Sequence, residues 1–276
     1  MTILVPTDFS PLSRIAVFYA AGLARPLNAN LVIAAVVNVN PSTETLLRSK
    51  RLEQELLASV QEEGDKLIAE IREKTAGPLD VSFETATGFP LDEQVELLVK
   101  RVGADLIVMG SRGASGLRRL LIGSNAVTVM NNSSIPVMII PEGVKYRKPE
   151  HIVYATDLFS YRDETNTVVA FAKLFDAHVH LLHVLPLHRK DDRDTKAIEA
   201  DLKKLTGYDK ISFEVTHHDD VATGVDQYVT QHGADILAMF THHLDFYEKL
   251  LGRSVTRRLA FHGSVPLLSF NKTTMS

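Results

Sequence analysis

An internal repeat constrains the fold of this chain more than any other feature. ILVPTDFS at 3–10 returns as IVYATDLF at 152–159, and VGADLIVMG at 102–110 returns as HGADILAMF at 232–240. A third stretch, SIPVMII at 134–140, returns as SVPLLSF. Matches in the same order along a chain indicate a repeated structural unit. The sequence therefore predicts a tandem duplication, with a polar, charged junction near 142–150 and domains at 1–145 and 150–276.

Each copy shows the pattern of a doubly wound α/β domain. Short apolar runs rich in Val and Ile alternate with amphipathic segments, which predicts a parallel sheet of five strands covered by helices on both faces. Copy two has a trimmed connection, since 186–210 replaces 38–80. In copy one the expected strands are 3–6, 31–37, 81–85, 104–109 and 136–140, and the expected helices are Pro11–Leu27 with Ser10 as N-cap, 43–75, Leu91–Val102 and Ser124–Asn132.

Composition narrows the functional classes. Residues 1–150 hold 16 Lys and Arg against 17 Asp and Glu, and the remainder 14 against 17, so neither half offers a basic surface for nucleic acid or anionic membranes. The chain has no cysteine, its N-terminus lacks the pattern of a secretory signal, and no apolar run approaches the roughly 20 residues of a membrane-spanning helix. We expect a cytoplasmic protein without nucleic-acid or membrane partners.

A glycine-rich segment follows the fourth expected strand of copy one. In an open α/β sheet, ligands bind outside the carboxyl ends of the strands, where the strand order reverses. Both Thr7-Asp8 and Gly110–Gly113 follow strands and are candidates to meet there. Gly123-Ser124 opens a helix whose first N–H groups could hold phosphate oxygens, with Arg112 screening their charge. No P-loop and no G-x-G-x-x-G after the first strand is present.

The spacing G-x2-G-x9-G-[ST], together with ILVPTDFS, resembles the nucleotide-binding signature of the universal stress protein family, over nearly the whole chain as two tandem domains. The resemblance implies ATP binding in copy one, with Asp8 on the adenine-bearing side, the backbone of Val36 at the base, and the glycine segment at ribose and phosphates. It also implies pairing of the copies through 136–140 and 266–270, or a homodimer. The implied pocket is Pro6, Thr7, Asp8, Val36, Met109, Gly110, Arg112, Gly113, Gly123, Ser124 and Asn125.

Simpler interpretations exist for the same residues. The glycines could serve only as turns, and Asp8 could merely cap the helix that follows it. The long charged segment 43–75 is typical of a solvated helix rather than of a partner site.

Copy two lacks the cradle. At the fixed offset of 130 residues, Gly110 becomes Phe240, Gly113 becomes His243 and Gly123 becomes Arg253, while Asp157 keeps the place of Asp8. Large side chains replace bare backbone where a phosphate would lie. We therefore expect copy two not to bind ATP in the manner of the family.

All 11 histidines lie at or beyond residue 151. Several follow expected strand ends of copy two, so imidazoles and a carboxylate could meet at the edge that binds nucleotide in copy one and hold zinc. The alternative is a residual pocket or plain surface. His178 and His180 alternate along a strand and are interpreted as structural. The candidate zinc ligands are Asp157, His183, His217 and His243.

Three functions are compatible with these patterns. The first is a non-enzymatic regulator of the stress response that binds ATP or a related adenine nucleotide in copy one, where no nucleophile and base pair is evident and any hydrolysis would be slow and metal-assisted. The second is a zinc-binding module or slow hydrolase centred on copy two. The third is an interaction scaffold whose pockets bind nothing.

Overall fold

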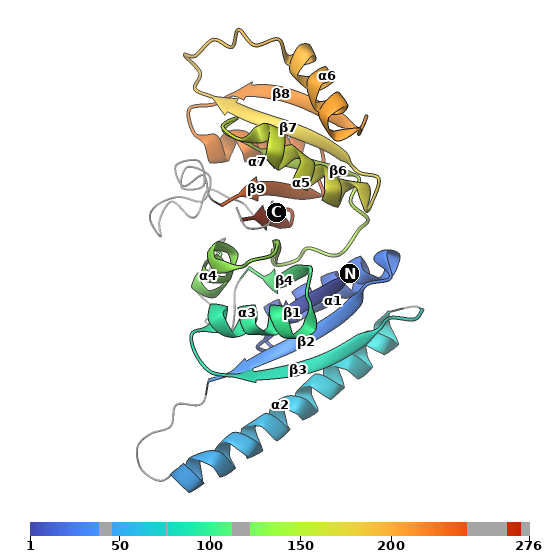
Figure 1. The fold of residues 1–276 in the computed structure, drawn as a ribbon, viewed down its shortest axis with the longest axis vertical. Coiled ribbons are helices and arrows are strands. Elements are labelled where there is room, and N and C mark those ends of the chain that lie inside the picture. Colours follow the sequence, from blue (N-terminus) through green and yellow to red (C-terminus); the bar gives the residue numbers. More distant parts are fainter. Residues whose placement is uncertain (39–45, 76, 112–121, 242–263, 272–276) are drawn as a thin grey trace. The chain divides into compact units, whose positions relative to one another are not determined.

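The computed structural model describes residues 1–38, 46–75, 77–111, 122–241 and 264–271. Contacts divide the chain into two compact units (Figure 1). Unit 1 holds the described residues of Met1–Gly116 and of Gly123–Tyr146, and unit 2 holds Ile122 and the described residues from Arg147 onward. Each unit is a parallel sheet flanked by helices, which confirms the predicted doubly wound α/β fold.

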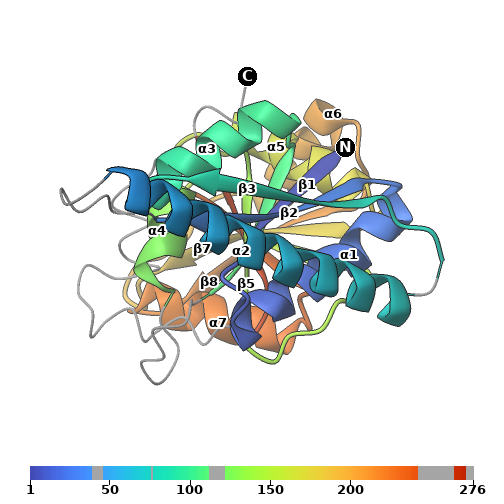
Figure 2. The same cartoon turned by 90° about the horizontal axis from the view of Figure 1, so that it is seen from below.

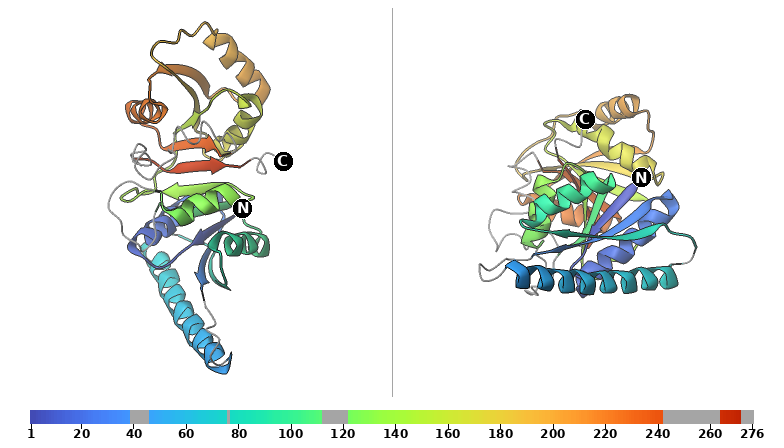
Figure 3. Two further views of the ribbon diagram at one scale, coloured as in Figure 1. Left: turned by 90° about the vertical axis from the view of Figure 1, so that its left-hand side faces the viewer. Right: turned by 60° about the horizontal axis from the view of Figure 1, so that its bottom comes forward.

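Unit 1 has the strand order β3-β2-β1-β4-β5, with every described pairing parallel. Helices α2 and α3 cover opposite faces of this sheet (Figure 3, right), and α2 runs along β3 (Figure 2). The elements are β1 (Thr2–Pro6), α1 (Pro11–Leu27), β2 (Asn30–Val37), α2 (Leu46–Lys74), β3 (Val81–Thr87), α3 (Leu91–Val102), β4 (Leu106–Gly110), α4 (Ser124–Asn132) and β5 (Val137–Ile140).

Local sequence signals set the helix ends in unit 1. The Ser10 side chain accepts a hydrogen bond from the Ser13 N–H at 3.2 Å, and Pro11 occupies the first turn, where its missing N–H costs nothing. Asn28, which is left-handed (φ 47°), caps the carboxyl end of α1, and Gly103 (φ 62°) caps that of α3. The predicted bounds of α1, α3 and α4 are confirmed.

Unit 2 repeats the order as β8-β7-β6-β9-β10, again with parallel pairings. Its strands are buried in the same way, with Ile152, Val153 and Leu181 at 0% exposure. In the described part of the chain no helix is long and apolar enough to cross a membrane. The elements are β6 (His151–Ala155), α5 (Tyr161–Lys173), β7 (His178–Leu185), α6 (Thr195–Thr206), β8 (Ile211–His217), α7 (Val221–Gln231), β9 (Ile236–Phe240) and β10 (Leu267–Phe270).

Candidate functional site

The strand order of unit 1 reverses between β1 and β4. From β1 the chain steps to β2 and β3 on one side of the sheet, and β4 and β5 lie on the other side. In open α/β sheets, ligands bind at such a switch point, outside the carboxyl ends of the two strands. Thr7-Asp8 follows β1, and Ser111 follows β4. Thr7-Asp8 and Ser111 therefore lie at this switch point, at the carboxyl ends of two adjacent strands.

The turn after β1 is fixed by its own side chains. Thr7 is 8% exposed, and its hydroxyl accepts the Phe9 N–H at 3.0 Å, while the Asp8 carboxylate accepts the Ser10 N–H at 3.1 Å. These bonds hold Phe9 at φ 58°, a left-handed conformation that side chains other than glycine rarely adopt. Since Ser10 caps α1, Asp8 does not, and the helix-cap interpretation of Asp8 is wrong. Asp8 instead shapes the turn and stays exposed at the edge.

The backbone of Val36 points to the β1 side of β2, at a level that β1 does not reach. In a parallel sheet the N–H and C=O of one residue point to the same neighbouring strand, and successive residues alternate. The Ala34 carbonyl accepts from Thr7 N at 2.8 Å, on the β1 side, whereas the Val37 carbonyl accepts from Gly88 N at 3.1 Å, on the β3 side. Val36 has the orientation of Ala34 but lies beyond Pro6, the last residue of β1. Its backbone therefore faces the space past the end of β1.

Backbone conformation does not explain the two described glycines of the predicted motif, Gly110 and Gly123. Gly110 is the last residue of β4 and pairs with Ile140. Gly123 has φ −63° and ψ 154°, an extended conformation open to any residue, and donates its N–H to the Ser111 carbonyl at 2.6 Å. The turn-only interpretation therefore fails to account for Gly123. A position that needs no positive φ and carries no side chain provides room for close approach to the backbone.

Helix α4 begins directly behind Gly123 without a side-chain cap. The first intrahelical bond joins Val127 N to the Gly123 carbonyl at 3.0 Å, so the N–H groups of Ser124 and Asn125 precede the helical bonding pattern. Both residues are exposed. Such donors at the positive end of a helix dipole suit a phosphate.

The predicted pocket residues divide into three groups. Four of them are buried at the carboxyl ends of β1 and β4: Pro6, Thr7, Met109 and Gly110. Asp8, Val36, Gly123, Ser124 and Asn125 are exposed or half-buried. Arg112 and Gly113 lie outside the described residues. A main-chain edge for a base, a carboxylate, and N–H donors at a helix start form a donor set that fits an adenine nucleotide.

The universal stress protein family model matches this chain twice, at residues 1–141 and 149–270. The chain belongs to the universal stress protein family. With one match in each copy, it is a tandem two-domain member.

Relatives and folds agree with this assignment. Over 144 residues, 52% of the chain, it is 34% identical to universal stress protein MJ0531 of Methanocaldococcus jannaschii, of which 83% is covered. It is 35% identical over 144 residues, 50% of the chain, to universal stress protein YxiE of Bacillus subtilis, of which 96% is covered. The crystal structure of a universal stress protein from Archaeoglobus fulgidus shares the fold at 19% identity, with a TM-score of 0.69 and 98% of each chain covered.

The second universal stress protein unit keeps the turn after its first strand. The Thr156 hydroxyl accepts the Leu158 N–H at 3.0 Å, the Asp157 carboxylate accepts the Phe159 N–H at 2.9 Å, and Leu158 has φ 68°. The bonds match those of unit 1, so this turn forms with or without a glycine segment in the same unit. Its presence alone does not mark a nucleotide site.

Phe240, in the place of Gly110, fills the core of unit 2. It is 2% exposed, stacks on Phe270 with ring centroids 5.1 Å apart, and meets Tyr154 edge-on at 5.7 Å. We expected its bulk to stand where a phosphate would lie, but its ring packs among other core side chains. Arg253 and His243 lie outside the described residues, so the expectation for copy two depends on positions that the structure leaves undescribed.

The zinc hypothesis for the carboxyl edge of unit 2 is not supported. Among the described residues, no three His, Asp or Glu side chains are grouped so that they could hold a metal ion. His183 donates from Nδ1 to the Thr156 carbonyl at 2.9 Å, and His217 donates from Nε2 to the Arg189 carbonyl at 3.0 Å. Burial lowers the pKa of His183 below its ordinary value. Two candidate ligands thus bind backbone, Asp157 is engaged in its turn, and His243 is outside the described part.

Proposed function

We propose that unit 1 binds ATP or a related adenine nucleotide and acts as a regulator rather than as an enzyme. The observation that carries this proposal is Gly123, a glycine in an extended conformation at an uncapped helix start, held against the end of β4. The base would lie against the backbone of Val36, the ribose near Asp8, and the phosphates at the N–H groups of Ser124 and Asn125. The negative charge of a bound nucleotide would change the conformation of the backbone that contacts it, and in this way binding would act as a regulatory signal.

The chemistry of unit 1 favours binding over turnover. Residues 1–150 contain no histidine or cysteine, so the usual base and the most reactive nucleophile are absent from this copy. One carboxylate oxygen of Asp8 accepts a hydrogen bond from the Ser10 N–H. We expect hydrolysis, if any, to be slow. Because the chain has no cysteine, a reducing compartment such as the cytoplasm suits it, and pairing through 136–140 and 266–270, or a homodimer, stays a prediction.

Calorimetry with ATP on the full chain, freed of nucleotide, tests the proposal. Gly123→Val keeps a permitted backbone conformation but adds a branched side chain, so we expect the affinity to fall at least tenfold with little change in the unfolding midpoint. Thr128→Val, one turn along the same exposed helix face, is the matched control and should bind like the parent. If the parent shows no binding at millimolar ATP, the nucleotide proposal fails and the interaction scaffold becomes the better hypothesis.

A further inference from the structure

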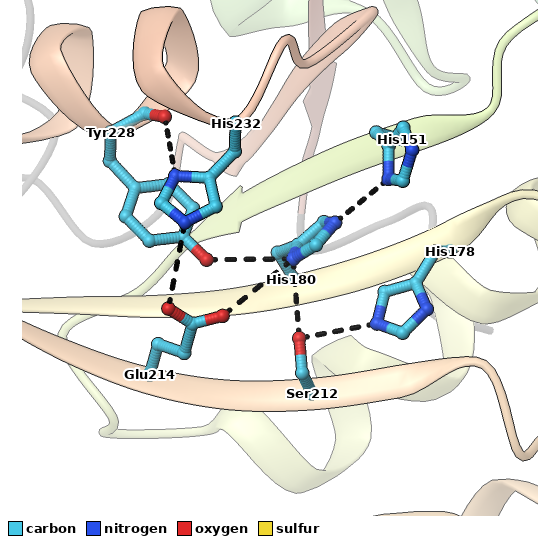
Figure 4. Close-up of polar contacts among 7 residues, drawn as sticks. All are labelled: His151, His178, His180, Ser212, Glu214, Tyr228 and His232. Atoms are coloured by element: carbon cyan, nitrogen blue, oxygen red, sulfur yellow. Dashed lines mark hydrogen bonds and ion pairs between the residues drawn. The ribbon is translucent and has the colours of Figure 1, made fainter.

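Unit 2 contains a second group of polar side chains, at the opposite end of its strands from the edge discussed above. Four imidazoles, a hydroxyl, a carboxylate and a phenol come together from the starts of β6, β7 and β8 and from the end of α7 (Figure 4). We call this group the histidine cluster. Its members are His151, His178, His180, Ser212, Glu214, Tyr228 and His232.

The contacts of the histidine cluster form a chain centred on His180. His180 Nε2 lies 3.0 Å from Nδ1 of His151, and His180 Nδ1 lies 3.2 Å from the Ser212 hydroxyl. The same hydroxyl lies 3.2 Å from Nε2 of His178. The His180 side chain is only 12% exposed. Three successive hydrogen bonds therefore link three imidazoles through one serine (Figure 4).

The chain of bonds limits how many protons it can hold. Each of the three contacts needs one hydrogen, and Ser212 can either donate one of them or accept in both of its contacts. If it accepts in both, the ring atoms in the contacts carry three hydrogens, and the outer nitrogens of His151 and His178 can carry two more. Three neutral imidazoles already carry three, so the intact chain accepts at most two more, and His151 and His180 cannot both become charged. When the contacts are broken, each imidazole can take up its own proton.

Groups on other elements surround the chain of bonds. The Glu214 carboxylate lies 3.8 Å from His180 Nδ1 and 3.9 Å from His232 Nε2, so it can balance about one added positive charge. The Tyr228 hydroxyl lies 3.4 Å from His180 Nδ1, and the Tyr228 ring stacks on His232 at 3.8 Å. On α6, the charge of Lys203 lowers the pKa of His178 and the charge of Glu199 raises it. Glu199 is itself paired with Lys203 at 2.7 Å, so further protons would mainly meet neighbouring imidazoles.

Burial, followed by the neighbouring imidazoles, lowers the pKa of His180 to about 4 from its ordinary 6.5. Burial likewise lowers the pKa of His178, and His151 adds to the effect. Both directions agree with the count of hydrogen bonds: the folded unit resists protons that the opened unit accepts.

Unit 1 has a version of the same place without titratable imidazoles. Strand register and the offset of 130 residues align Glu214 with Glu84, His180 with Val32 and Tyr228 with Leu98. There Glu84 faces Arg101, whose Nη2 lies 3.0 Å from its carboxylate and which keeps its charge at any physiological pH. An arginine–carboxylate ion pair in unit 1 thus corresponds to a network of imidazoles in unit 2.

We propose that the histidine cluster is an acid-sensitive element that loosens the amino end of the unit 2 sheet when the pH falls below about 6.5, while unit 1 keeps its stability. Mild acid would then open one copy of the duplicated fold selectively. The proposal does not depend on nucleotide binding, because the histidine cluster lies at the other end of the strands and in the other unit.

Amide hydrogen exchange of the full chain at pH 7.5 and pH 5 tests this, read as protection factors corrected for the intrinsic exchange rate. For His180 alone, a pKa of about 4 against 6.5 gives at most about a thirtyfold drop in the folding equilibrium constant at pH 5. We expect protection in β7 and β8 to fall at least severalfold, and protection in β2 and β3 to change less than twofold.

Substitutions by the unit 1 residue isolate the cause. His180→Val should remove most of the pH dependence in β7 and β8, whereas His188→Gln, at an exposed histidine of the same unit, should retain all of it. Equal protection of β7 and β8 at both pH values, or a full drop in His180→Val, would overturn the proposal. Should His180→Val not fold, imidazole titration of the parent by NMR decides, since a His180 midpoint near 6.5 contradicts the proposal.

Discussion

The hydroxyl of Tyr154 donates a hydrogen bond to the carboxylate of Glu164, and both side chains are 1% exposed. Val5 and Ala16 occupy the corresponding positions of unit 1, where both are fully buried. A polar pair therefore replaces an apolar pair at one place in two copies of one fold. Burial and the nearby Glu164 charge raise the pKa of Tyr154 well above its ordinary value, so the phenol stays protonated and donating.

Removing one partner of this pair should cost more than removing both. Glu164→Ala leaves a buried hydroxyl without its acceptor as well as a cavity, and we expect the free energy of unfolding to fall by about 2–4 kcal/mol. Tyr154→Val should cost a similar amount, because it removes a hydrogen-bond donor to a buried carboxylate and leaves a cavity. The double substitution restores the unit 1 pair, so urea titration should show a loss well below the sum of the two. Additive losses would mean that the two groups do not interact.

The paired turns after β1 and β6 allow a test of what the threonines do. Thr7→Val removes the acceptor of the Phe9 N–H with little change of shape, and we expect a loss of about 1–2 kcal/mol in unfolding free energy. Thr156→Val should cost the same in unit 2. Calorimetry with ATP should then separate them: affinity falls in Thr7→Val and is unchanged in Thr156→Val. Equal effects on affinity would argue against a site in unit 1.

Gly64 sets how closely α2 approaches β3. A methyl group at this position would overlap the Phe83 ring, so Gly64→Ala should destabilise unit 1 by about 1–3 kcal/mol despite the better helix propensity of alanine. Ala69→Gly, on the exposed face of α2, measures propensity alone and should cost about 1 kcal/mol. Phe83→Leu added to Gly64→Ala should recover part of the loss in thermal unfolding. If Gly64→Ala were stabilising, the overlap would be absent.

The charge of Glu214 should set the lower end of the acid response. Glu214 partly offsets the lowering of the His180 pKa, so Glu214→Gln should lower that pKa further. A histidine whose folded pKa lies below its unfolded value contributes stability that is complete above pH 6.5 and is lost as the pH falls toward the folded pKa. The window of loss should thus extend below pH 4 in the variant, as followed by imidazole NMR. Glu84→Gln in unit 1, which breaks the Arg101 pair, should cost stability without moving any imidazole signal.

Local signals predicted most of the helices but placed some strands imperfectly. Ser10, Pro11 and Gly103 determine helix ends through caps and backbone conformation, which depend only on nearby residues. The run expected at 104–109 begins as a strand only at Leu106, because the Ala104 N–H turns back to the Val99 carbonyl at the end of α3. Strand β3 continues past its expected end to Thr87, since pairing with β2 extends it through polar positions.

Side-chain orientation is what the sequence could not supply for the histidines. His183 and His217 do lie toward the carboxyl ends of β7 and β8, as expected, but backbone carbonyls bind their ring nitrogens. The histidine cluster was missed because its members come from four separate stretches of the chain. The alternation of His178 and His180 was the available signal, and aligning them with His151 across the strand register would have indicated the group.

The direction of the Val36 backbone bears on how the site would tolerate mutation. A base recognised by main-chain N–H and C=O groups is read by atoms that every amino acid possesses. Exchanging the Val36 side chain would alter packing while leaving the recognition pattern in place, as long as β2 keeps its register with Ala34 bonded to Thr7. Ligand choice at this edge would then follow from the strand geometry and not from the identity of the side chain at position 36. Related proteins could differ at this position and still select the same base.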